Sequence, residues 1–144
     1  MDSLKINTGI KRIMINDDPD NIITFNPSDV AFAERFYSLI SEFEGKLAEF
    51  KARSEAIDAN TEVDINDIPV NLQDRLDLMR DACIYIRERI DHLFGDGTSQ
   101  KVFGDVLNLD CFTQFFEGIT PFIQTARSEK LAKYNQKLSG RVMK

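Results

Sequence analysis

The sequence predicts a mainly α-helical fold, in which a helical hairpin and a kinked C-terminal helix follow a small N-terminal β-hairpin. Two long segments, 27–57 and 71–94, carry apolar residues at alternating steps of three and four, which is typical of amphipathic helices. A cluster of turn formers separates two short β-prone runs near the N-terminus. The length of 144 residues suits one domain, so we expect residues 1–144 to share one modest core.

The β-hairpin is expected at about residues 10–26. The β-prone runs 12–15 and 22–25 flank Asn16-Asp17-Asp18-Pro19-Asp20-Asn21. This acidic turn lacks the spaced oxygen ligands, the central glycine and the twelfth-position glutamate of an EF-hand calcium loop. We therefore interpret it as a turn and expect no metal there.

The first long helix is expected at 27–57. Asn26 can cap its start, Pro27 suits the first helical position, and Asp29 favours the positive end of the helix dipole. Its apolar seam consists of Ala33, Phe36, Ile40, Phe43, Leu47, Phe50 and Ile57. A helix from Ser28 to Ile57 would be ~45 Å long. A compact domain of this size has a diameter under ~40 Å, so one end of this helix could project and need a partner.

The second long helix is expected at 71–94, after a connecting loop at 58–70. Asn71 offers a cap with Asp74 three positions on. Its seam consists of Leu72, Leu76, Met79, Cys83, Ile86, Ile90 and Leu93. Two seams of similar length can pair as an antiparallel hairpin, with a third helix packed across them.

The third helix is expected at 110–137, beyond a short helical turn capped by Thr98 or Ser99. Asp110 can cap its start, and Gly118 with Thr120-Pro121 should interrupt or kink it, because proline lacks the backbone donor. Residues 138–144 are expected to form a flexible tail.

No set of residues predicts catalysis, a cofactor or a metal site. His92 lies at a predicted helix end and has no nucleophile beside it in the sequence, and Gly95 to Lys101 lacks the spacing of a phosphate-binding loop. Cys83 and Cys111 are too far apart for a C-x-x-C motif, and we expect reduced, idle thiols. The sequence therefore predicts a protein that is not an enzyme.

The charge distribution is uneven. The last eighteen residues have six cations and one anion, a net charge of +5. Because the whole chain has a net charge of −6, the first 126 residues have a net charge of −11. An acidic body repels phosphate, so we expect no nucleic-acid partner. The basic end either complements its helix dipole or contacts an acidic partner. No signal peptide or membrane span is evident, and we expect a cytoplasmic protein without membrane contact.

Several segments resemble one known family. They are Ile15-Asn16-Asp17-Asp18, Ile23-Thr24-Phe25-Asn26-Pro27-Ser28-Asp29-Val30, the segment from Phe94 to Asp105, and the segment from Phe115 to Ile123. Together with the order of elements over residues 10–135, they resemble the tail assembly chaperones of long-tailed phages and prophages of Gram-positive bacteria.

The resemblance implies a non-catalytic chaperone in the bacterial host cell. It would bind the tape measure protein, keep that long helix soluble and help recruit tail tube subunits. The sequence also favours a homo-oligomer. The candidate partner-binding residues are Phe36, Phe43, Phe50, Phe112, Phe115, Phe116 and Phe122. The alternative is a structural virion component, such as a tail completion or connector subunit, that uses its hairpin edge and helices to assemble a ring.

Overall fold

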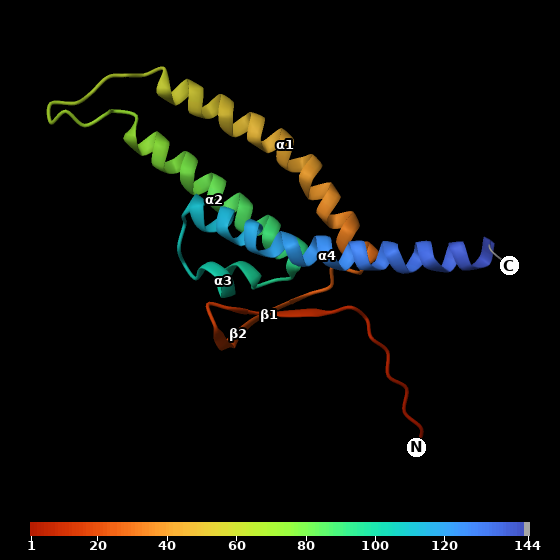
Figure 1. Ribbon diagram of the computed structural model, residues 1–144. Coiled ribbons are helices and arrows are strands. Elements are labelled where there is room, and N and C mark those ends of the chain that lie inside the picture. The colour runs from red at the N-terminus through yellow and green to blue at the C-terminus, as the bar shows by residue number, and fades with distance from the viewer. Residues whose placement is uncertain (143–144) are drawn as a thin grey trace.

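The computed structural model describes the backbone of residues 1–142 and the side chains of residues 1–125. Its elements are β1 (Lys11–Ile15), β2 (Asp18–Phe25), α1 (Val30–Asp58), α2 (Leu72–Phe94), α3 (Thr98–Phe103) and α4 (Leu109–Val142). Figure 1 shows the loop end of the α1–α2 hairpin extending to one side, α3 and the two strands lying near its other end, and α4 starting beside α2 and projecting past that end. The predicted class, mainly helical with an N-terminal β-hairpin, is confirmed.

The two strands form an antiparallel sheet joined by a tight turn. Asn16 and Asp17 both have positive φ, of 54° and 58°, which asparagine and aspartate tolerate better than most residues. Ile13 lies opposite Ile23, and Met14 lies opposite Ile22. Because side chains alternate along a strand, Ile23 enters the core, whereas Met14 stays half exposed on the other face.

The first helix begins at Val30 and not at residue 27. Asn26 belongs to the preceding turn, where its Oδ1 accepts from the Ser28 backbone N at 3.0 Å and its Nδ2 donates to the Thr8 carbonyl at 2.7 Å. The N-cap is Asp29, whose Oδ1 accepts from the Ala31 backbone N at 2.9 Å. The carboxylate predicted to favour the dipole therefore caps the helix directly.

The helices α1 and α2 run antiparallel and meet through aromatic rings. The Tyr85 ring of α2 lies 6.2 Å from the Phe43 ring and 6.0 Å from the Phe50 ring, measured between centroids. Ion pairs join Arg53 to Asp81 at 3.0 Å and Arg89 to Glu42 at 3.4 Å. Because partners early in α1 contact residues late in α2, the predicted antiparallel hairpin is present.

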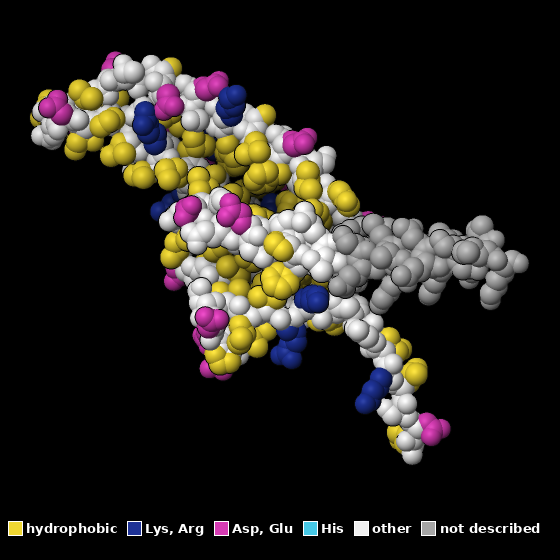
Figure 2. Space-filling model, in the orientation of Figure 1, with side chains coloured by type: hydrophobic (Ala, Val, Ile, Leu, Met, Phe, Trp, Pro, Cys, Tyr) yellow, Lys and Arg dark blue, Asp and Glu magenta, His cyan; other side chains and the backbone are white. Residues whose placement is uncertain are grey.

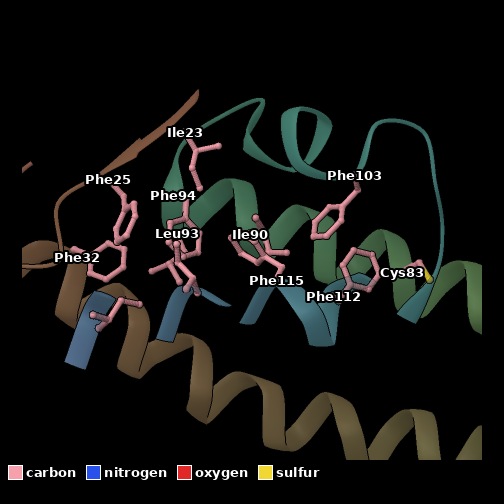
Figure 3. Packing of buried hydrophobic residues seen from close by; sticks show 12 residues of the cluster. Ile23, Phe25, Phe32, Cys83, Ile90, Leu93, Phe94, Phe103, Phe112 and Phe115 are labelled. Atoms are coloured by element: carbon pink, nitrogen blue, oxygen red, sulfur yellow. The ribbon is translucent and has the colours of Figure 1, made fainter. Parts of the chain in front are cut away.

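The core lies at the end of the hairpin away from its loop and is built largely from aromatic residues of several elements (Figure 3). The Phe94 ring makes edge-to-face contacts with the rings of Phe25, Phe32 and Phe115 at centroid distances of 5.3, 5.6 and 5.4 Å. Phe103 of α3 meets Phe112 of α4 at 4.7 Å. Such geometry adds about 0.5–1.5 kcal/mol per pair beyond the burial of area.

The last helix continues through the predicted interruption. Pro121 lies inside α4, and the hydroxyl of Thr120 donates to the Phe116 carbonyl at 2.6 Å. The backbone remains helical to Val142, beyond the predicted end at 137, so the predicted tail is helical at 138–142. Residues 143 and 144 lie outside the described residues, as do the basic side chains from Arg127 onward.

Candidate functional site

The hairpin of α1 and α2 is longer than the part of the fold that covers it. Figure 1 shows its tip, with the loop between the two helices, extending away from α3 and α4. Figure 3 places Cys83 of α2 beside Phe112, which lies in the first turn of α4. The stretch of α2 that precedes Cys83 therefore lies beyond the start of α4.

One apolar row of α2 passes from exposed to buried at this point. Leu72, Leu76 and Met79 are 44, 51 and 50% exposed. They share a helix face with Cys83 and Ile90, which are 1 and 0% exposed, because the steps between them are four, three, four and seven residues. The N-terminal half of α2 thus presents to solvent the same face that its C-terminal half buries in the core.

A matching row lies on α1. Ile40 and Leu47 are 44 and 52% exposed, and steps of seven place them on the face of Ala33. Ala33 lines a cavity of about 210 Å³ together with Thr120 and Gln124 of α4. The row of Ile40 and Leu47 therefore faces the side of the hairpin on which α4 lies.

We call the surface formed by these two rows the hairpin groove; its residues are Ile40, Leu47, Leu72, Leu76 and Met79. Figure 2 shows hydrophobic side chains gathered along the hairpin between α1 and the start of α4. Two neighbouring helices with apolar rows on one side form a surface that accepts a third amphipathic helix. At the groove's outer end, Arg75 and Asp58 form an exposed ion pair of 3.0 Å between α2 and α1.

All five groove residues were predicted to lie in the seam between the two helices, and this prediction is wrong for them. In the structure Lys46 and Arg53 of α1 lie beside α2, and Leu47, which was expected there, is 52% exposed. The Lys46 Nζ lies 5.4 Å from the centroid of the Tyr85 ring, and Arg53 pairs with Asp81. Long cationic side chains cover aromatic surface with their stems and keep their charges in water, which lets them replace leucine in the seam.

The predicted partner-binding phenylalanines fall into three environments. Phe112 and Phe115 are 3 and 9% exposed and belong to the core. Phe36 and Phe116 are half-buried against that core, and Phe43 and Phe50 are half-buried against Tyr85. Only Phe122 among the seven is exposed, at 44%.

Phe122 lies at a second hollow, bounded by β1 and α4 and reaching inward to β2 and α3, with a volume of about 400 Å³. We call it the β1 groove. The strand side contributes four consecutive residues to its wall, from Ile13 to Asn16, and the helix contributes Cys111, Gln114, Phe115, Gly118, Ile119 and Phe122. The structure thus separates Phe122 from the hairpin groove, although the sequence grouped it with the other phenylalanines.

Two titratable side chains of α2, Cys83 and Tyr85, have a raised pKa. Burial raises the pKa of the Cys83 thiol, and the nearby Arg87 opposes this shift only in part. Burial also raises the pKa of Tyr85, with a further contribution from the Glu42 carboxylate. His92 lies in the last turn of α2, as predicted. Among the described side chains, no three His, Cys, Asp or Glu residues come together in a way that could hold a metal ion.

Comparison with known proteins identifies a family without assigning a function. A model of DUF6673, described as a family of unknown function, matches residues 19–144. No curated protein and no solved structure matches the chain. Within the described part of the chain, no helix is long and apolar enough to cross a membrane.

Proposed function

The chain belongs to the DUF6673 family, whose function is unknown, and we propose that it is a non-catalytic chaperone that binds an amphipathic helix of another protein in the hairpin groove. The observation that carries this proposal is the pair of exposed apolar rows on the α4 side of α1 and α2. Where α4 begins, the row on α2 is covered by the core; beyond that point it is open. An uncovered continuation of a helix-binding face favours a second helix as its occupant.

The groove runs diagonally along the hairpin. The ion pairs of Glu42 with Arg89 and of Asp58 with Arg75 set the register of the two helices, so the α1 row lies level with the second half of α2 and the α2 row lies level with the end of α1. From Ile40 to the level of Leu72 the groove is therefore about 30 Å long, the length of about twenty helical residues. A partner helix that repeats apolar residues at i, i+3, i+4 and i+7 over this length matches it. Full burial of one leucine, isoleucine or methionine stabilises by about 1.5–3 kcal/mol, and less for side chains that are already half covered.

We further propose that the bound helix belongs to a tape measure protein in a bacterial host cell. The resemblance to tail assembly chaperones supports this choice, and so does the physical task. A long apolar helix aggregates in water, and a groove that covers its apolar stripe prevents this. In the same proposal the chain works in the cytoplasm as a homo-oligomer and helps bring tail tube subunits to the bound helix.

The proposal is tested by co-expression with a phage tape measure protein. We expect the wild-type chain to raise the soluble fraction of the tape measure protein and to co-purify with it. Leu76→Asp places a charge in the groove and should abolish both effects. The matched control is Ile84→Asp, because Ile84 is also on α2 and 41% exposed but lies off the groove row.

Two results would contradict the proposal. One is a tape measure protein that stays insoluble with the wild-type chain, together with a stoichiometric amount of the chain in purified virions. That result would favour a structural virion component. The other is equal loss of binding in Leu76→Asp and Ile84→Asp when circular dichroism shows that both variants are folded, because the groove would then have no special role.

A further inference from the structure

The outer edge of β1 opens onto the β1 groove. In the described residues the sheet has two strands, and β1 pairs with β2 alone. Side chains of successive strand residues point to opposite faces, yet Ile13, Met14 and Ile15 of β1 all line this groove, which also reaches beneath the sheet to Ile23 of β2 and to Val102 and Phe103 of α3. A hollow that touches both faces of a strand runs along its backbone edge, where unpaired N–H and C=O groups can accept another strand.

The opposite wall of the groove has the length of a strand and leaves room for a backbone. From Cys111 to Phe122 the helix α4 extends about 16 Å, and a five-residue strand such as β1 extends about 17 Å. Gly118 lies in the middle of this wall, and a Cβ added there would meet no atom within 4 Å. Met14 and Phe122 line the groove with 54 and 44% of their surface exposed, so an incoming strand would bury apolar surface on both walls.

The charges along β1 identify the incoming strand. The strand begins with Lys11 and Arg12, continues through three apolar residues, and ends at a turn that contains Asp17 and is followed by Asp18, the first residue of β2. Antiparallel pairing of two such strands places the cationic start of each beside the anionic turn of the other. With Met14 on the two-fold axis, Ile13 lies opposite Ile15 of the second copy, and Lys11 lies beside the turn at Asn16 and Asp17 of that copy. The edge is therefore complementary to itself in charge, as an isologous interface requires.

We propose that a second copy of this chain pairs its β1 with β1 in antiparallel register, which joins the two hairpins into one four-stranded sheet. The interface is distinct from the hairpin groove and does not depend on the chaperone function. A two-fold axis normal to the sheet keeps the helix-covered face of both copies on the same side. The Phe122 side chain of each copy then lies against the β1 strand of the other.

Light scattering over a concentration series tests the proposal. Wild type should have twice the chain mass of 16.5 kDa. The double variant Lys11→Glu with Arg12→Glu places like charges opposite one another at both ends of the interface. Its dimer should dissociate at a concentration about tenfold higher or more. These side chains are exposed, and circular dichroism checks that the variant is folded.

Cross-linking gives a second readout that does not depend on charge. In a Cys111→Ser background, Met14→Cys should form a disulfide-linked dimer on mild oxidation, because directly opposite residues of antiparallel strands lie within disulfide range. Val63→Cys is the matched control, since Val63 is equally exposed at 54% but lies in the distant hairpin loop. A monomeric wild type overturns the proposal. A dimer that survives the charge reversal, together with a Met14→Cys variant that does not cross-link, also overturns it, because another surface must then hold the dimer.

Discussion

The side chain of Asn71, at the start of α2, caps the end of α1 by donating from Nδ2 to the Ile57 carbonyl at 2.9 Å. The same nitrogen donates to the Asn60 carbonyl, also at 2.9 Å. Asn71 is 2% exposed and makes no side-chain bond to its own helix, although the sequence predicted it as the cap of α2. Asn71 occupies the N-cap position of α2, but its side-chain amide bonds to the end of α1 and to the start of the loop instead. One buried side chain therefore links the end of α1 and the start of the loop to the start of α2.

Replacing Asn71 should destabilise the hairpin tip. Asn71→Ala removes both bonds and leaves the carbonyls of Ile57 and Asn60 without this donor in a part-buried site, which should cost about 1–3 kcal/mol in the free energy of unfolding. Urea unfolding followed by circular dichroism measures this loss. Gln73→Ala is the control, because the Gln73 side chain bonds to the exposed Asp77 and should lose under about 0.5 kcal/mol. Equal losses in both variants would show that Asn71 has no capping role.

Alanine substitution of the predicted partner-binding phenylalanines should destabilise the fold strongly at core positions and weakly at exposed ones. Phe112→Ala empties a core position that is 3% exposed and should cost about 3–5 kcal/mol. Phe122→Ala changes a side chain that is 44% exposed at the β1 groove and should cost under about 1 kcal/mol. Thermal unfolding of the two variants beside the wild type gives the comparison. A large loss in Phe122→Ala would mean that α4 depends on the β1 groove within one chain.

Local signals in the sequence were sufficient to predict every element of this fold. Turn formers at Asn16 and Asp17 and the helix stop at Gly95 lie where the structure has them, and the loop predicted at 58–70 is found one residue later, at 59–71. Helix ends were harder to predict, because candidate caps lie close together. Asn26 and Asp29 both offer a capping side chain, but the Asn26 side chain is used in bonds to Thr8 and Ser28, and Asp29 caps the helix.

The hairpin groove could not be predicted from periodicity alone. A seam predicted from apolar spacing assumes that the apolar residues face the partner helix. Helix α1 has two such rows, one through Phe43 and one through Leu47, which lie about 40° apart around the helix. The stems of Lys46 and Arg53 decide which row faces α2. Whether the other row is covered depends on where α4 begins along the hairpin. The place at which α4 begins to cover the hairpin depends on packing between segments that are distant in the sequence, and no local sequence pattern predicts such packing.

Tyr85 should make the stability of the hairpin depend on pH in alkaline solution. Burial first, and the Glu42 carboxylate second, raise the pKa of its phenol, while Arg89 opposes the shift. The unfolded chain has the ordinary pKa of about 10. A raised pKa in the folded state means that the contribution to stability is complete below about pH 10 and is lost as the pH rises through the folded value.

Urea unfolding at a series of pH values between about 8 and 11 measures this effect. Tyr85→Phe keeps the ring between Phe43 and Phe50 but has no phenol to ionise, so its stability should fall less steeply with pH than that of the wild type. Tyr37→Phe is the control, because Tyr37 is 63% exposed on α1, and its slope should match the wild type. Identical slopes in wild type and Tyr85→Phe would contradict the assignment.

A helix that occupies the hairpin groove should stabilise the folded chain. Any ligand that binds only the native state raises the free energy of unfolding, by about 2.7 kcal/mol when its concentration is one hundred times its dissociation constant. A synthetic amphipathic helix from the tape measure protein, with apolar residues at i, i+3, i+4 and i+7, should therefore raise the Tm of the wild type and of Ile84→Asp. It should leave the Tm of Leu76→Asp and Leu47→Asp unchanged, because either charge would be buried against the apolar stripe without a partner. A peptide with the same composition but scrambled spacing should leave all four proteins unchanged. If the scrambled peptide stabilises the wild type as well, the chain binds apolar sequences in general and does not select a helix face.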